Sequence, residues 1–109
     1  MRLPGGDAAV VERHKLTGYC LNVEHPRGKH KARVFARLGF SAENAEELRS
    51  ALLNAAATAD AQAARSDEFG DRYVLEFEIE GPRGNGIVRS TWIVRRGESV
   101  PRLTSCFLK

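Results

Sequence analysis

The feature that most constrains how this 109-residue chain can fold is an alternation near its middle. Residues 73–80 read YVLEFEIE, and from Leu75 onward apolar and acidic residues take turns. A period of two places alternate side chains on opposite faces of a β-strand. We therefore expect a strand here with one buried face and one face in water.

Turn signals after this segment predict that it belongs to an antiparallel sheet. The glycine-rich stretch 81–86 (GPRGNG) predicts a turn, and residues 87–94 predict a second strand that closes a hairpin. A second turn over 95–101 leads to a third strand over 102–108. Residues 8–12 also read as a short strand.

The first half of the chain has helical spacing instead. Residues 14–21 predict a short helix, and in residues 29–38 the apolar side chains share one helical face. Gly39 supplies a stop, and Ser41 is an N-cap for a third helix that runs into the alanine-rich stretch 55–64. The expected fold class is α+β, with N-terminal helices packed on a C-terminal antiparallel sheet of three to four strands.

Length and composition favour one small domain without membrane segments, metal or cofactor. We expect a flexible tail at residues 1–7 and a single domain over 8–109. No apolar run is long enough to span a membrane and no secretory signal is visible, which predicts a cytoplasmic location. Cys20 and Cys106 form no CxxC motif and read as small core residues, and the three histidines lack metal-ligand spacing.

The strongest functional signal is a run of basic residues without any acidic residue. Between positions 25 and 37 lie His25, Arg27, Lys29, His30, Lys31, Arg33 and Arg37. Free N–H groups and the helix dipole already favour an anion at the start of a helix. The run predicts a phosphate-sized anion site, with RNA as the expected ligand.

Charge is also distributed unevenly along the chain. Residues 1–42 carry eight Lys/Arg against three Asp/Glu, a net +5; residues 43–80 carry three against ten, a net −7; residues 81–109 carry six against one, a net +5. If the two basic segments meet in space, they form a cleft that attracts polyanions. If they do not, the charges are solvated faces.

Within the basic helix, Lys31 is the candidate site residue. Lys31 precedes Phe35 by four residues and Leu38 by seven, so it lies on the apolar stripe near the packed face. The alternative is that its ammonium group extends into solvent over the core edge. The other basic residues of the helix are expected to contact the RNA backbone. They are Lys29, His30, Arg33 and Arg37.

Further candidates lie in the preceding loop and in the sheet. His25 precedes Pro26 and can act as a general acid or base, or be a surface loop residue. Arg89 either reaches the bound anion or pairs with a glutamate of the preceding strand. Alternation places Arg89 and Ser90 on opposite faces, so a bulge is needed for both to line one site. Ser105, or Thr104 beside it, offers a hydroxyl on the third strand.

Three segments resemble a small bacterial domain family of unassigned function. They are KLTGYCLNVEHPRGKHKARVFARLGF at 15–40, RYVLEFEIEGPRGNGIVRSTWIV at 72–94 and PRLTSCF at 101–107. The family pattern is a K-L-x-x-Y-L-L-N-x-x-H-P-x-G-x-x-K-A-x-x-F block, an R-T-V-W-I strand and a P-R-L-x-T-x-Y ending. The matching site positions are His25, Gly28, Lys31, Arg89, Ser90 and Ser105. Here Ser90 and Ser105 replace threonine, Cys20 replaces leucine, and Phe107 replaces tyrosine.

The resemblance implies a function, because such domains are similar to the barnase–EndoU–colicin–RelE group of ribonuclease toxins. It implies a metal-independent endoribonuclease in which the RNA 2′-hydroxyl attacks the adjacent phosphate, with an antitoxin or immunity protein as partner. The catalytic residues implied are His25, Lys31, Arg89, Ser90 and Ser105. The alternative is a non-catalytic RNA- or protein-binding module that works with a partner protein.

Overall fold

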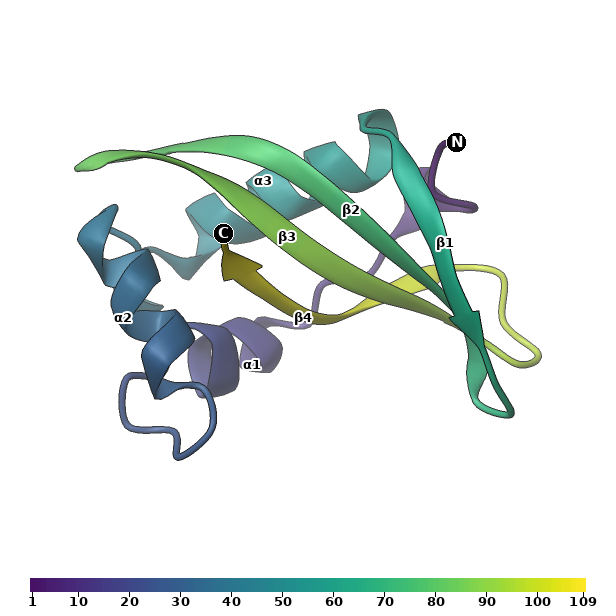
Figure 1. Ribbon diagram of the computed structural model, residues 1–109, viewed down its shortest axis with the longest axis horizontal. Coiled ribbons are helices and arrows are strands. Elements are labelled where there is room, and N and C mark those ends of the chain that lie inside the picture. Colours follow the sequence, from purple (N-terminus) through teal and green to yellow (C-terminus); the bar gives the residue numbers. More distant parts are fainter.

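The structure is a computed structural model that describes residues 1–109. The short helical elements are η1 (Gly6–Ala8), α1 (Arg13–Lys15), η2 (Leu16–Cys20) and η3 (Ala42–Asn44), and the longer helices are α2 (Lys29–Arg37) and α3 (Ala45–Thr58). The strands are β1 (Ala61–Ser66), β2 (Gly70–Gly81), β3 (Gly84–Arg95) and β4 (Pro101–Leu108). Helices come first and the sheet last, which confirms the expected α+β class (Figure 1).

The four strands form an antiparallel meander in the order β1-β2-β3-β4. β2 and β3 pair along their full length, from Gly70 opposite Arg95 to Gly81 opposite Gly84. The alternation predicted in β2 is present, with Leu75 and Ile79 buried and the glutamates exposed. One face of the sheet is therefore apolar.

Helix α3 covers that apolar face. In Figure 1 it runs behind β2 and β3, so the opposite face of the sheet is turned toward the viewer. Leu48 and Leu52 of α3 are completely buried in one cluster with Leu75 and with Trp92 of β3. Burial of such side chains contributes about 1.5–3 kcal/mol each, so this cluster is the main source of stability.

Helices α1, η2 and α2 lie together at one end of the molecule, on the left in Figure 1, where they contact β4. α2 begins after Gly28, buries Ala32 and Phe35, and stops at Gly39, which has a left-handed φ of 91°. The predicted helix over 29–38 is thus present. The helical segment 13–20 agrees with the predicted short helix over 14–21.

The third helix ends earlier than the alanine content predicted. α3 stops at Thr58, and residues 61–66 form β1 instead of continuing the helix. Ala61 pairs with Leu75, and Ala63 pairs with Tyr73. Alanine favours a helix locally but buries little area. Backbone pairing with the otherwise unpaired edge of β2 therefore outweighs the helix propensity of these residues.

The first residues of the chain pack against α3. Leu3 is buried, and the Arg2 guanidinium donates to the carbonyl oxygen of Ala57 at 3.3 Å. The short strand expected over 8–12 is reduced to a single parallel bridge between Val10 and Arg102. No helix is long and apolar enough to cross a membrane.

Candidate functional site

The loop before α2 holds His25 in a fixed orientation. Its Nδ1 accepts hydrogen bonds from the backbone N–H groups of Arg27 and Gly28, both at 3.0 Å. An imidazole nitrogen that accepts cannot carry a proton, so the ring proton lies on Nε2. His25 therefore satisfies two N–H groups at the start of α2 and keeps Nε2–H as a donor.

Gly28 lets this loop lie directly on the preceding helical segment. A Cβ atom at this position would come within 2.5 Å of the carbonyl oxygen of Tyr19. Any larger residue would push the loop, and His25 with it, away from η2. The glycine of the His-Pro-x-Gly block is thus explained by close packing.

Tyr19 connects His25 to Lys31. The rings of Tyr19 and His25 are edge to face with their centroids 4.8 Å apart. The ammonium nitrogen of Lys31 lies 5.4 Å from the Tyr19 ring centroid and 5.4 Å from that of Phe107 on β4. A cation held between two aromatic rings is stabilised by their π-faces, by about 0.5–2 kcal/mol for each contact.

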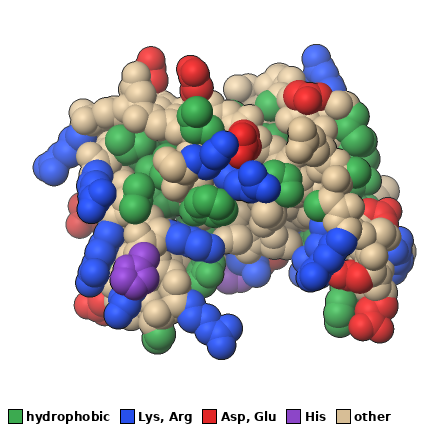
Figure 2. Space-filling model, in the orientation of Figure 1, with side chains coloured by type: hydrophobic (Ala, Val, Ile, Leu, Met, Phe, Trp, Pro, Cys, Tyr) green, Lys and Arg blue, Asp and Glu red, His purple; other side chains and the backbone are tan.

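No carboxylate neutralises this cation. Lys31 forms no ion pair, and Glu24 is the only acidic residue between positions 13 and 42. The basic side chains of the helical end that form no ion pair are Lys15, Arg27, Lys29, Lys31, Arg33 and Arg37. Figure 2 shows Lys and Arg side chains gathered over α2, with a histidine among them. This end of the molecule is an uncompensated positive surface.

Arg89, in contrast, is already paired. Its guanidinium lies 3.1 Å from Glu76 on the preceding strand, which also binds the Lys109 ammonium at 3.2 Å. Lys109 and then Arg89 lower the pKa of the Glu76 carboxyl below its ordinary value. Of the two interpretations open for Arg89, the pairing with a strand glutamate is the one the structure contains. Arg89 lies opposite Phe107 in the sheet, so it borders the Lys31 site without joining it.

Ser90 lies in the core rather than at the site. It is completely buried, donates a 2.9 Å hydrogen bond to the Leu75 carbonyl oxygen, and accepts one of 2.9 Å from the Trp92 indole. Arg89 and Ser90 are on opposite faces, as alternation predicted. The sheet does contain a bulge, but in β4 at Thr104, which leaves this opposition intact.

Ser105 lies beside the Tyr19–Lys31 cluster. Its Oγ is buried without a nitrogen or oxygen partner, and the Ser105 side chain helps to lower the pKa of the neighbouring Cys20 thiol. A buried hydroxyl without a strong partner costs about 1–3 kcal/mol, which makes it unusual in a core. The structure thus brings His25, Lys31 and Ser105 to one region through Tyr19, and leaves Arg89 beside it and Ser90 outside it.

Two buried thiols form the floor of this region. A hydrogen bond from the Cys106 thiol, together with the Cys106 backbone N–H and the charge of Lys31, lowers the pKa of Cys20 to about 7 despite its burial. The shared hydrogen bond and burial raise the pKa of Cys106 well above its ordinary value. Both cysteines are core residues, as expected, and both are free thiols.

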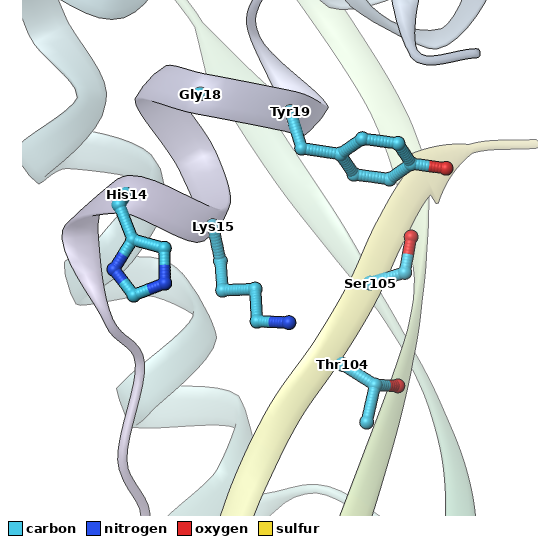
Figure 3. A pocket seen from close by; sticks show the side chains of 6 residues that line it. All are labelled: His14, Lys15, Gly18, Tyr19, Thr104 and Ser105. Carbon is cyan, nitrogen blue, oxygen red and sulfur yellow. The ribbon is translucent and has the colours of Figure 1, made fainter.

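A pocket also opens beside Tyr19 (Figure 3). It has a volume of about 530 Å³ and is lined by His14, Lys15, Gly18, Tyr19, Thr104 and Ser105. The sequence pattern singled out none of His14, Lys15 and Tyr19 as a site residue. Tyr19 had a usable signal, because it belongs to the same K-L-x-x-Y block as the candidate histidine and lysine. Lys15 and His14 had no such sequence signal, since only the packing of α1 against β4 places them at a pocket.

The arrangement provides a fixed cation, an imidazole N–H donor and a spare hydroxyl around an aromatic ring. These groups suit an anion with an attached planar ring better than they suit a metal. No group of three or more His, Cys, Asp or Glu side chains is placed to hold a metal ion.

Residues 2–109 match the family described as "Domain of unknown function (DUF6883)", and the chain belongs to this family. Among solved structures, the chain is similar to a chain of the "Contact-dependent growth inhibition toxin - immunity protein complex from Klebsiella pneumoniae 342". The TM-score is 0.72 at 18% sequence identity, over 95% of this chain and 97% of that chain, which shows a shared fold. No curated protein matches the sequence.

Proposed function

We propose that this DUF6883 domain is a toxin-type endoribonuclease whose site is the cluster of Lys31, His25 and Tyr19. The observation that carries the proposal is the unpaired Lys31 ammonium held between the Tyr19 and Phe107 rings. Without a carboxylate beside it, this cation is available to a phosphate. The fold shared with a chain of a growth-inhibition toxin–immunity complex supports the toxin assignment.

The reaction we propose is attack of the RNA 2′-hydroxyl on the neighbouring phosphorus. The 2′-O–P bond forms and the P–5′-O bond breaks, which leaves a 2′,3′-cyclic phosphate and a 5′-hydroxyl. The proton of the 2′-hydroxyl passes to solvent. His25 donates a hydrogen bond from Nε2–H to the departing 5′-oxygen, since its Nδ1 is occupied by backbone N–H groups, and solvent water supplies the proton that this oxygen takes.

Lys31 stabilises the negative charge that builds on the phosphate, and the Ser105 hydroxyl is a further donor to it. Charge stabilisation of this kind is worth ~3–4 kcal/mol per group in acyl transfer, and we expect a similar value here. Lys29, His30, Arg33 and Arg37 hold the RNA backbone. Arg89 receives no catalytic role because Glu76 neutralises it, and Ser90 receives none because it is buried.

The test compares Lys31→Met with Lys29→Met. Methionine keeps the aliphatic contact with the two rings but removes the charge. We expect cleavage of a single-stranded RNA to fall by about 10²–10³ in Lys31→Met and by less than about tenfold in Lys29→Met, with cyclic phosphate ends on the wild-type product. In bacteria, induced wild type should stop growth and fragment RNA, and Lys31→Met should not. Intact RNA with every form would overturn the proposal.

The second candidate is a non-catalytic module that binds RNA or a partner protein. It is supported by the exposed, unpaired cations of α2, which need no precise geometry to bind a polyanion. This alternative predicts RNA binding without new product ends. An immunity-type partner would then cover the same surface and would be acidic at the contact.

A further inference from the structure

We propose that the pocket between α1, η2 and β4 is a subsite for one unstacked nucleobase. The proposal rests on the proposed function, because the phosphate of the same nucleotide would lie at Lys31. The expected ligand is an uncharged aromatic ring with polar edges. The subsite would add a contact with the RNA base to the contact that Lys31 makes with the phosphate.

The pocket has the size and shape that such a ligand requires. Its volume of about 530 Å³ is within the usual range of small-molecule pockets. Lys15 extends from the helical segment toward β4, while Thr104 and Ser105 form the opposite wall (Figure 3).

Tyr19 makes this pocket continuous with the phosphate site. Its ring is 5.4 Å from the Lys31 ammonium and also lines the pocket. Proteins that recognise single-stranded RNA stack splayed bases on aromatic side chains and read their edges by hydrogen bonds. One tyrosine that contacts the cation and also lines a hollow large enough for a base is an arrangement that suits one nucleotide.

The pocket also has unused hydrogen-bonding groups. Lys15 forms no ion pair, and the buried Ser105 hydroxyl has no nitrogen or oxygen partner in the protein. Thr104 is different, since its hydroxyl already bonds with Thr91 at 2.6 Å. A base edge would give the Lys15 ammonium group the partner it lacks.

A bulge in β4 creates this wall. β4 shifts register so that Ser105 lies opposite Thr91 while Leu103 lies opposite Trp92, and Thr104 is the extra residue. Consecutive residues of a regular strand point to opposite faces, but a bulge re-aims one of them. Thr104 and Ser105 therefore both line the pocket.

Gly18 allows the pocket to be filled without disturbing the fold. A Cβ atom added there would meet no other atom within 4 Å. Gly18→Leu therefore places a side chain in the hollow, in a helical segment that tolerates it. Thr17→Leu is the matched control, because Thr17 is exposed on the same segment and does not line this pocket.

The experiment measures binding of the four nucleoside 5′-monophosphates and of ribose 5-phosphate by calorimetry. We expect at least one nucleotide to bind about tenfold more tightly than ribose 5-phosphate, since stacking and edge contacts come from the base. This difference should disappear in Gly18→Leu and persist in Thr17→Leu. Circular dichroism checks that both variants are folded.

The outcomes separate this proposal from the proposed function, because none of these probes can be cleaved. Equal binding of ribose 5-phosphate and all four nucleotides overturns the base subsite, even if the protein cleaves RNA. A base contribution that survives Gly18→Leu overturns the location. A base contribution in a protein that never cleaves RNA supports the subsite and overturns only the ribonuclease proposal.

Discussion

Ser90 and Ser105 carry the same hydroxyl group in opposite surroundings. Ser90 joins the Leu75 carbonyl oxygen to the Trp92 indole N–H inside the core. Ser105 is buried beside Tyr19 with no nitrogen or oxygen partner. Because a buried indole N–H without an acceptor is costly, the Ser90 hydroxyl serves stability, whereas the Ser105 hydroxyl is the one we propose for contact with a ligand.

We predict that Ser90→Ala lowers the free energy of unfolding by about 1–3 kcal/mol, since it leaves the Trp92 indole N–H unpaired. Ser105→Ala removes only the contact with the Cys20 thiol and should cost less. Urea denaturation followed by the fluorescence of Trp92 measures both values. If Ser105→Ala proved the more destabilising of the two, the assignment of these hydroxyls would be wrong.

At the scale of elements, α2 carries unpaired positive charges at some cost to its own stability. Lys29, Arg33 and Arg37 follow one another at intervals of four residues, and none forms an ion pair. Like charges at this spacing destabilise a helix by roughly 0.2–0.5 kcal/mol per pair. Packing of Phe35 and Ala32 keeps the helix in place despite this repulsion.

Replacing the middle charge should therefore separate stability from binding. We predict that Arg33→Glu raises the free energy of unfolding by about 1 kcal/mol, because attraction replaces repulsion at both neighbours. The same change should weaken RNA binding. The control is Arg95→Glu, which alters net charge equally at an exposed, unpaired position at the end of β3. Denaturation and RNA titration are run on both variants, and equal losses of RNA affinity would remove α2 from the binding surface.

At the scale of the whole molecule, the fold pairs most cations of one basic segment and leaves most of the other free. Of the six cations in residues 81–109, four pair with acidic residues (Arg89, Arg96, Arg102 and Lys109), and Arg83 and Arg95 form no ion pair. Their counterparts in α1, α2 and the loop before α2 have no such partners except Arg13, which pairs with Glu46. The positive end is consequently formed mainly by the first basic segment, with Arg83 beside it, because the backbone N–H of Arg83 donates to the Leu38 carbonyl oxygen just after α2.

This difference predicts which cations contribute to the salt dependence of RNA binding. Lys29→Gln should reduce the slope of log affinity against log salt by about 0.7, the value for one contact with a single strand. Arg102→Gln should leave the slope unchanged, because Arg102 is bound to Glu98 at 3.1 Å. Titration of a 2′-O-methyl RNA, which cannot be cleaved, at several salt concentrations gives the slopes. A similar loss in both variants would mean that binding follows net charge rather than this surface.

The elements that the sequence predicted well are those whose apolar residues have a clear period. β2 alternates from Leu75 to Glu80, and α2 places Phe35 and Leu38 on one face, so local pattern and burial agree. β1 was missed because its sequence, AQAARS, has no alternation and pairs only where β2 offers a free edge. The predicted helix ran past the true end of α3 at Thr58 because the alanines of β1 favour a helix until they pair with β2.

For the site, the sequence by itself determined the chemical groups: a histidine in a tight loop, a basic helix start and an apolar stripe that puts Lys31 at its edge. Only the tertiary structure decided which of these groups meet. It placed the Phe107 and Tyr19 rings around Lys31 and opened a pocket beside Lys15. It also paired Arg89 with Glu76 and buried Ser90 as the acceptor of the Trp92 indole N–H. The physical reason is that charge and period are local properties of a chain, whereas partners, burial and cavities depend on residues far apart in sequence.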